Sequence, residues 1–257
     1  MKYVMIIKCT EADLDILNEY LYREKELNLF VISDIEVFGF EDSNIEVFID
    51  YDNTIRTVYL RFFDNMCLVS YDNIIDFKFL KTIIDEHSIA NINGEKELIN
   101  KIKMDNFRVE DYYFSSLTEL EVEVDDSGVS ELDIHNFEQY IDAANKVFNN
   151  QSDYEAAKAE LEKNAKHIFV CKENGKVVSG ASSSAESKEL AMIIGVFTDE
   201  NHRRKGYAQK CVHALCKKLL NEGKTVCLFY DNPNAARMYE KLGFKQKGYL
   251  STLKKDN

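Results

Sequence analysis

Residues 190–208 read Leu-Ala-Met-Ile-Ile-Gly-Val-Phe-Thr-Asp-Glu-Asn-His-Arg-Arg-Lys-Gly-Tyr-Ala, an apolar run that passes directly into a basic turn. The apolar part, residues 190–198, predicts a central β-strand. A helix is predicted after the turn, because apolar residues then recur at helical spacing, at Ala208, Cys211, Val212, Leu215 and Leu219. Residues 225–230 predict the next strand. Strand, helix and strand in this order predict a right-handed crossover, which makes the two strands parallel neighbours.

The turn between the first strand and the helix combines basic side chains with a small residue at a helix N-terminus. Arg203, Arg204 and Lys205 stand directly before Gly206. Free backbone N–H groups and the positive end of the helix dipole meet there, and glycine lets a phosphate approach the backbone closely. The turn therefore favours a pyrophosphate, although it is neither a Walker A loop nor a dinucleotide-binding glycine motif. A solvated basic surface without a ligand is the alternative for this segment alone.

Residues 231–244 read Asp-Asn-Pro-Asn-Ala-Ala-Arg-Met-Tyr-Glu-Lys-Leu-Gly-Phe. Together with the basic turn, this segment resembles the GNAT superfamily of acyl-CoA-dependent N-acetyltransferases. The turn matches the family pattern of Arg or Gln, two residues, Gly, one residue, then Gly or Ala, through Arg203, Gly206 and Ala208. The second segment matches the pattern that follows through Asn232, Ala235, Tyr239, Lys241, Gly243 and Phe244. The resemblance covers residues 115–257 and is firmest over 190–244.

The resemblance implies a cofactor site for acetyl-CoA as cosubstrate. In the family, the strand matching residues 194–198 separates from its neighbour, and its backbone pairs with the pantetheine amides; Val196 and Thr198 are carried over as those contacts. The pyrophosphate is expected on the N–H groups of Arg203, Arg204, Lys205, Gly206, Tyr207 and Ala208. Asn232 and Ala235 are carried over as cofactor-binding residues, and Asn232 would hydrogen-bond the pantetheine arm or fix the end of the separated strand. For Asn232, an ordinary helix cap before Pro233 is the alternative.

The resemblance also implies a direct transfer, in which the amine and acetyl-CoA bind together and the amine attacks the thioester. The family tyrosine that protonates the CoA thiolate corresponds to Tyr239. Family members often take the proton of the amine with a glutamate near the start of the first strand, or with a water chain. Glu189 is the candidate by position and Glu186 the weaker one, while a solvated charge at the strand end is the alternative. His202 and His213 are expected at the surface.

The rest of the second half predicts further elements of one domain, residues 111–257. Helices are expected over 133–149 and 152–164, and a β-hairpin over 167–182 around Asn174-Gly175, whose two residues accept positive φ. The fold class expected is α/β (α+β). A GNAT-like domain with a mixed, mostly antiparallel sheet and one splayed parallel pair would be accompanied by a smaller N-terminal α/β domain.

The N-terminal domain, residues 1–110, carries no cluster that demands chemistry. Strands are expected over 29–38, 45–50, 55–63 and 66–70, and helices over 76–87 and 94–104. This order resembles the glycine N-acyltransferase-like branch, in which a degenerate copy of the acyltransferase fold accompanies the active one. Residues 1–110 hold 12 basic and 22 acidic residues, and residues 111–257 hold 20 and 23. That acidity would favour a cationic or amine-rich acceptor.

Composition narrows the function classes. The chain has 257 residues and a net charge of −13, which suits a nucleic acid backbone poorly, and no apolar run reaches membrane-spanning length. Six scattered cysteines without a C-x-x-C pair predict a reduced, cytoplasmic protein and no metal site. The expected partner is a small-molecule or peptide amine, and the oligomeric state stays open. An acyl-CoA sensor without turnover, or a protein that binds ATP or NAD at the basic turn, are the alternative functions.

Overall fold

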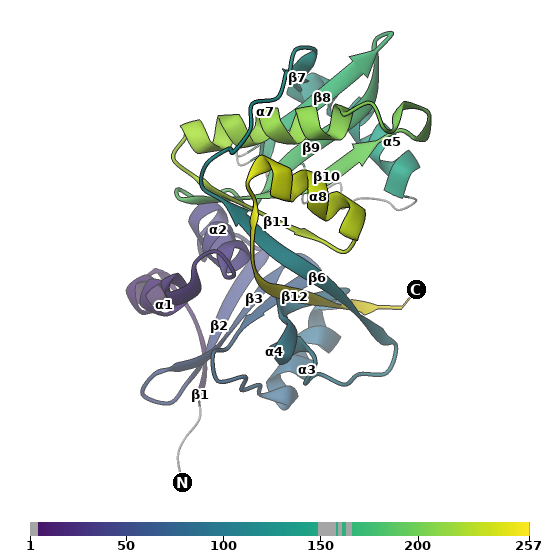
Figure 1. Ribbon diagram of the computed structural model, residues 1–257. Coiled ribbons are helices and arrows are strands. Elements are labelled where there is room, and N and C mark those ends of the chain that lie inside the picture. Colours follow the sequence, from purple (N-terminus) through teal and green to yellow (C-terminus); the bar gives the residue numbers. More distant parts are fainter. Residues whose placement is uncertain (1–4, 149–157, 159–160, 163–165, 257) are drawn as a thin grey trace. The chain divides into compact units, whose positions relative to one another are not determined.

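The computed structural model describes residues 5–148, 158, 161–162 and 166–256. It divides into two compact units, each with strands and helices (Figure 1). The first unit comprises residues 1–114 and 248–257, and the second comprises residues 115–247. The division lies close to the predicted boundary at residue 110. The C-terminal segment 248–257, however, belongs to the first unit and not, as predicted, to the second.

The first unit contains a sheet of order β1-β2-β3-β4-β5-β12-β6, in which β4 and β5 are parallel neighbours. Its elements are β1 (Met5–Lys8), α1 (Leu14–Leu21), α2 (Leu29–Phe38), β2 (Ile45–Tyr51), β3 (Ile55–Phe62), β4 (Asn65–Val69), α3 (Phe77–His87), β5 (Asn91–Glu95) and α4 (Lys96–Ile99). Strands β6 (Phe107–Leu117) and β12 (Lys245–Lys255) contribute residues to both units. Apolar side chains of α3 and α4 pack with the sheet in one core cluster.

Two predictions for the first unit were wrong. Residues 29–38 form helix α2 and not a strand. Most residues of this helix are buried, and its sequence is apolar almost throughout. Periodicity cannot distinguish a helix from a strand in such an apolar run. Residues 94–104 do not form one helix, because β5 extends to Glu95 and α4 covers only Lys96–Ile99. A Cβ on Gly94 would lie 2.8 Å from the Leu68 carbonyl oxygen, so glycine allows β5 to approach β4.

The second unit contains a sheet of order β6-β11-β10-β9-β8-β7. Its elements are β7 (Val129–Glu131), α5 (Phe137–Phe148), β8 (Ile168–Glu173), β9 (Lys176–Ser184), β10 (Leu190–Thr198), α7 (Tyr207–Asn221), β11 (Thr225–Tyr230) and α8 (Pro233–Leu242). The β8–β9 hairpin is present as predicted, with φ of 51° at Asn174 and 76° at Gly175. The predicted helix over 152–164 lies largely outside the described residues.

Strands β10 and β11 are the parallel pair of the second unit, as the strand-helix-strand pattern predicts. Within the described residues they pair from Leu190 with Thr225 to Ile193 with Leu228, whereas β10 continues to Thr198 and β11 to Tyr230. The two strands therefore separate toward their carboxyl ends. The predicted fold class, a mixed and mostly antiparallel sheet with a splayed parallel pair, is confirmed.

A β-bulge interrupts β10 where the two strands separate. Ile194 pairs with Ser182 and Phe197 with Gly180, so two residues of β10, Gly195 and Val196, face one residue of β9. The bulge shifts the alternation of side chains. Ile193 therefore packs in the cluster with α7, while Phe197 packs with α5 on the other face. In a regular strand these two residues would share a face.

The described elements of the two units follow one another in the same order. In the first unit β1, α1 and α2 precede an antiparallel pair of strands, and in the second unit β7 and α5 do. In both units a fourth strand, a helix, a strand and a further helix then complete the order. The parallel pairs, β4–β5 and β10–β11, hold corresponding places in that order. Helix α3 thus corresponds to α7. The sequence showed no repeat, so the correspondence is one of topology.

Candidate active site

The first part of the site is the edge of β10 beyond its pairing with β11. Ile194 is the first residue of β10 without a partner on β11, and the strand runs on through Val196 to Thr198. Backbone groups on such an edge can pair with an extended ligand, as an added strand would. The structure thus places Val196 and Thr198 on the segment where the sequence predicted pantetheine contacts.

The second part is the turn at the start of α7. Gly206 is the N-cap with φ of 81°, without a side-chain cap bond, and Arg204 is also left-handed, with φ of 65°. The first N–H groups of a helix have no partner within the helix, and left-handed residues before it curl the backbone so that such groups converge. A Cβ on Gly206 would meet no atom within 4 Å, so the space beside it is open. These features fit a pyrophosphate.

Glu173, at the end of β8, holds the basic turn in place. Tyr207 donates its hydroxyl proton to this carboxylate, Lys205 Nζ lies 3.6 Å from it, and His202 Nε2 lies 3.3 Å from it. The Tyr207 hydroxyl, with Lys205 and His202, holds the pKa of Glu173 below its usual range. The carboxylate therefore stays charged and offsets part of the basic charge of the turn. No sequence pattern predicts this contact, because it joins residues far apart in the chain.

Arg203 and Arg204 remain available to an anion. Arg203 Nε donates to the Thr198 carbonyl at 3.3 Å, and its only recorded acid among the described residues, Glu200, lies 3.8 Å away. Arg204 makes no ion pair with any residue that the structure describes, and both arginines are exposed. The turn thus presents two guanidinium groups next to the open N–H groups of α7.

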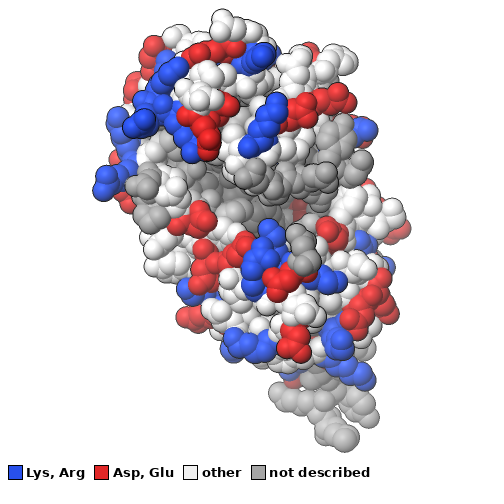
Figure 2. Space-filling view, turned by 90° about the vertical axis from the view of Figure 1, so that its right-hand side faces the viewer, with Lys and Arg blue, Asp and Glu red and all other residues white. Residues whose placement is uncertain are grey.

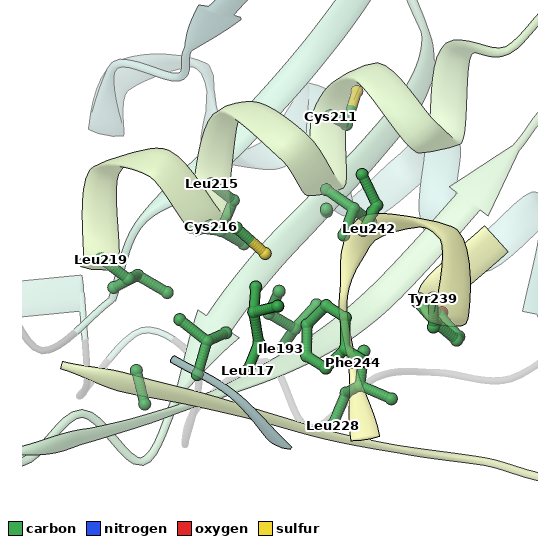
Figure 3. Packing of buried hydrophobic residues seen from close by; sticks show 14 of the residues in the cluster. Leu117, Ile193, Cys211, Leu215, Cys216, Leu219, Leu228, Tyr239, Leu242 and Phe244 are labelled. Carbon is green, nitrogen blue, oxygen red and sulfur yellow. The ribbon is translucent and has the colours of Figure 1, made fainter. Parts of the chain in front are cut away.

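Tyr239, on α8, lies at the margin of the core cluster of the second unit (Figure 3). Its ring centroid is 5.5 Å from that of Tyr230 and 5.8 Å from that of Phe244, and 7% of the residue is exposed. Burial raises the pKa of Tyr239 to about 12, with Cys216 and Tyr230 adding to the effect. The hydroxyl is therefore protonated at neutral pH and can donate a proton or a hydrogen bond.

Asn232 and Ala235 lie where β11 passes into α8. The Asn232 carbonyl accepts hydrogen bonds from Ala235 N at 2.9 Å and Ala236 N at 3.4 Å, so Asn232 occupies the backbone position of a helix cap. Its side chain is exposed, and Ala235 packs against the core cluster. The structure brings both residues to the separated end of the β10–β11 pair, because α8 follows β11 directly.

Glu186, the weaker of the two candidate bases, is buried in an ion-pair network. Only 3% of its side chain is exposed; Ser183 donates a hydrogen bond to it, and Lys224 Nζ lies 2.5 Å away. Glu222 contacts the same ammonium at 3.1 Å, and His167 Nε2 lies 3.5 Å from Glu222. His167, Glu186 and Glu222 could together hold a cation, a role that the Lys224 ammonium already fills for the two acids.

Glu189 is exposed and immediately precedes β10. The bulge begins at Gly195, which is five residues into the strand and therefore roughly 16 Å from its start at a rise of about 3.3 Å per residue. The structure thus does not bring Glu189 together with the bulge and the basic turn. Both candidate glutamates lie at the paired end of β10, away from the splayed end.

The basic residues of α7 do not form a face that contacts only solvent, because several of them contact acidic side chains. Lys210 Nζ lies 3.7 Å from Asp125, and His213 Nδ1 lies 3.1 Å from Asp126. His213 has no exposed surface, which corrects the expectation that it lies at the surface. Acidic and basic side chains are interspersed on the face of the molecule that Figure 2 shows. Charge alone therefore does not mark the ligand site.

The sequence also missed the hydroxyl groups beneath the bulge. Ser179 Oγ donates to the Phe197 carbonyl at 2.6 Å, and Tyr140 on α5 places its hydroxyl 3.3 Å from the Gly195 carbonyl. Serine and tyrosine are common in such elements, so no sequence pattern distinguishes them. Only the fold shows which of them face the bulge.

Comparison with known proteins adds independent evidence. Residues 132–244 match the family model "Acetyltransferase (GNAT) family". An uncharacterized N-acetyltransferase, YjdG, from Bacillus subtilis is 37% identical over 83 residues, which cover 30% of this chain. The chain spans about half, 49%, of the length of that relative. No helix among the described residues is long and apolar enough to span a membrane.

Solved structures share the fold over most of the chain. A GCN5-related N-acetyltransferase from Sphaerobacter thermophilus matches with a TM-score of 0.62 and 14% identity, over 98% of this chain and 95% of that one. A tandem GNAT protein from the clavulanic acid biosynthesis pathway matches with a TM-score of 0.54 and 8% identity, over 98% of each chain. Residues 132–244 are thus similar in sequence to the GNAT acetyltransferase family, and the solved structures show that the fold is shared.

Proposed function

We propose that this protein is an N-acetyltransferase that transfers an acetyl group from acetyl-CoA to a primary amine by direct attack in a ternary complex. The observation that carries the proposal is one continuous arrangement in the second unit. The separated edge of β10 leads to the N–H groups at the start of α7, next to Gly206. Tyr239 lies on α8, the helix that follows the neighbouring strand β11. One face of an extended acyl-CoA could contact all three.

The cofactor-binding roles follow from that arrangement. Val196 and Thr198 would pair with the pantetheine amides, and the N–H groups from Arg203 to Ala208 would hold the pyrophosphate. Arg203, Arg204 and Lys205 would offset its charge. Asn232 and Ala235 would contact the pantetheine arm where β11 meets α8.

In the reaction, the neutral amine attacks the thioester carbonyl and forms a C–N bond. The nitrogen of the tetrahedral intermediate is then positively charged and loses one proton to water. The intermediate collapses to the amide, the C–S bond breaks, and the electron pair leaves on sulfur. Tyr239 donates its phenolic proton to that sulfur, a role supported by a pKa that burial keeps at about 12. Bulk solvent restores the tyrosine proton.

The amine must lose a proton before or during attack, because a lysine-like amine has a reference pKa of about 10.4. Glu186 is bound to Lys224 and Ser183, and Glu189 lies at the far end of β10, so neither faces the proposed site. We therefore assign this proton to water, the other route open to the family. A covalent route through cysteine lacks support, since Cys211 and Cys216 are fully buried and burial raises the pKa of Cys216.

The acceptor is proposed to be a small-molecule or peptide amine. The repeated order of elements supports a further proposal, that the first unit is a degenerate acyltransferase copy like that of the glycine N-acyltransferase-like branch. The acidity of residues 1–110 favours a cationic acceptor. Neutralising exposed acids of this segment should raise KM for a polyamine without changing KM for acetyl-CoA. If the variant and the wild type have the same KM for the polyamine, the proposal of a cationic acceptor is refuted.

Thermal unfolding with acetyl-CoA, CoA, ATP and NAD in parallel is the first test. A ligand at 100 times its Kd should stabilise the fold by about 2.7 kcal/mol, which a melting curve resolves. We expect a shift with acetyl-CoA and CoA alone; a shift confined to ATP or NAD would replace the proposal by a nucleotide-binding function. A Tyr239→Phe variant then separates enzyme from sensor. An enzyme should lose about 10- to 100-fold in kcat while CoA affinity is retained, whereas a sensor shows no wild-type turnover across an amine panel.

A further inference from the structure

Tyr140 is a buried tyrosine whose hydroxyl reaches the bulge of β10. It lies on α5 and is 4% exposed. Its oxygen is 3.1 Å from Ser182 Oγ and 3.3 Å from the Gly195 carbonyl oxygen. Burial raises the pKa of Tyr140 to about 12. The group therefore keeps its proton through the neutral range and acts as a hydrogen-bond donor.

Serine hydroxyl groups also donate hydrogen bonds to the carbonyls on both sides of the bulge. Ser182 Oγ donates to the Ile194 carbonyl at 3.3 Å, and Ser179 Oγ donates to the Phe197 carbonyl at 2.6 Å. A bulge disrupts the regular ladder, so its carbonyl groups need other partners. Tyr140 supplies the partner at Gly195, the residue with positive φ.

Two glycines leave room for the Tyr140 side chain at the bulge. A Cβ on Gly195, where φ is 59°, would lie 2.7 Å from the Tyr140 hydroxyl oxygen. A Cβ on Gly180, the residue opposite Phe197, would lie 2.9 Å from Tyr140 Cε2. Glycine on both strands thus accommodates the tyrosine, which indicates that the ring and hydroxyl have a defined place rather than a general packing role.

The contact also fixes the next N–H group. The peptide between Gly195 and Val196 is planar and trans, so its N–H points opposite to its carbonyl. The Gly195 carbonyl faces the Tyr140 hydroxyl on the α5 side, and the Val196 N–H is therefore directed away from α5. The α7 side of the sheet carries the cluster that contains Tyr239.

We propose that Tyr140 is a positioning residue, whose hydrogen bond sets the orientation of the Gly195–Val196 peptide against the pantetheine arm of the bound cosubstrate. This inference rests on the proposed function, which assigns the Val196 backbone to the cosubstrate. Tyr140 itself touches neither substrate nor reacting atoms; it acts through the bulge. CoA carries the same pantetheine amides as acetyl-CoA, so a displaced peptide weakens the binding of CoA as well as misplacing the thioester.

Tyr140→Phe removes only the hydroxyl, and Tyr20→Phe is the matched control. Tyr20, in the first unit, is also 4% exposed and donates to a backbone carbonyl, that of Arg56, at 3.1 Å. We expect Tyr140→Phe to lower kcat about 10- to 100-fold, since displacement of the thioester by about 1 Å can cost 100-fold, and to raise Kd for CoA more than about twofold. Amide exchange of residues 194–198 should accelerate. Tyr20→Phe should leave kcat and this exchange unchanged.

A double variant tests the coupling directly. Gly195→Ala introduces a Cβ against the Tyr140 oxygen, and Tyr140→Phe removes that atom, so the combined loss in kcat should be smaller than the product of the single losses. Multiplicative losses, or a Tyr140→Phe kcat within about twofold of wild type, would overturn the inference while the proposed function stands. Absence of acetyl-CoA binding and turnover in the wild type would instead refute the proposed function.

Discussion

Two glycines of the second unit have the same backbone conformation and different surroundings. Gly206 precedes α7 and Gly223 follows it, both with φ of 81°, and a Cβ on either would meet no atom within 4 Å. An alanine at either position therefore introduces the same left-handed strain, about 1 to 2 kcal/mol, without a clash. Only Gly206 borders the open N–H groups of the basic turn.

We expect Gly206→Ala and Gly223→Ala to destabilise the protein equally, but only Gly206→Ala to weaken CoA binding, by about tenfold or more. The added methyl group would occupy space that a phosphate needs beside the backbone. Chemical unfolding measures the first effect and calorimetric titration with CoA the second. Equal CoA affinities in the two variants would show that the pyrophosphate does not lie on this turn.

Tyr239 leads to a prediction about pH. Because burial raises its pKa to about 12 from the ordinary value near 10, its proton-donating form persists to higher pH than that of an exposed tyrosine. We expect kcat to rise with pH as the amine loses its proton, and to show no fall between pH 8 and 10. A pH profile of the wild type and Tyr239→Phe tests this. A fall near pH 9 that is absent from the variant would contradict the raised pKa.

The sequence points to candidate site residues that belong to continuous motifs, and it does not reveal contacts that act across the fold. Gly206 and Tyr239 stand in short patterns whose spacing follows from a turn or a helix. Glu173 and Tyr140 reach the candidate site from β8 and α5, so no local spacing relates them to it. No local pattern shows either that Glu186 contacts a lysine 38 residues away in the sequence.

At the scale of elements, one buried ion pair joins the end of β9 to the start of β11. Lys224 and Glu186 have side chains that are 14% and 3% exposed. Burial alone lowers the pKa of Lys224, but the contacts with Glu186 and Glu222 outweigh it and raise the pKa above its usual range. The stabilisation is therefore intact at neutral pH and is lost only as pH rises past about 10.4.

Lys224→Met should lower the free energy of unfolding by about 3 to 5 kcal/mol, because it removes the ammonium that pairs with the buried Glu186 carboxylate at 2.5 Å. Lys218→Met is the control, since Lys218 is 40% exposed and pairs with Glu222 one helical turn away; its loss should cost about 0.3 to 0.5 kcal/mol. Urea unfolding followed by circular dichroism gives both values. Equal losses would mean that water reaches Glu186.

Elements were predictable where their pattern is local. The β8–β9 hairpin follows from Asn174-Gly175, and α7 follows from its apolar spacing. Strand β5 was missed because Asn-Ile-Asn-Gly-Glu has low strand propensity, and its pairing with β4 and β12 supplies the stability instead. Stability that comes from pairing with other strands cannot be recognised in the sequence of one strand alone.

At the scale of the whole molecule, the two units share an order of elements but differ at the helix that follows the fourth strand, which is α3 after β4 and α7 after β10. Helix α3 is capped by the Asp76 side chain, which accepts hydrogen bonds from the N–H groups of Lys78 and Phe79. The residues before it, 70–76, include two acids and no base. The carboxylate of Asp76 therefore takes the place that an anion would need at this helix.

The cavity between the ends of β4 and β5 is also small. It has a volume of about 20 Å³ and is lined by Leu68, Tyr71 and Gly94 among others. This is room for about one water molecule. Pairing of β4 with β5 also ends before the two strands do, at Cys67 with Asn93, but Gly94 lets β5 lie close to the Leu68 carbonyl there.

We therefore expect the full chain to bind one acetyl-CoA and not two. Calorimetric titration should give a stoichiometry of one, and replacing Arg203 and Arg204 together by Ala should abolish that single binding event, because both guanidinium groups lie at the turn before α7. Replacing Asp76 by Ala should cost about 1 kcal/mol of stability through the lost cap and leave the stoichiometry at one. Two binding events in the wild type, or one that survives the double arginine variant, would show that the first unit binds the cosubstrate despite its carboxylate cap.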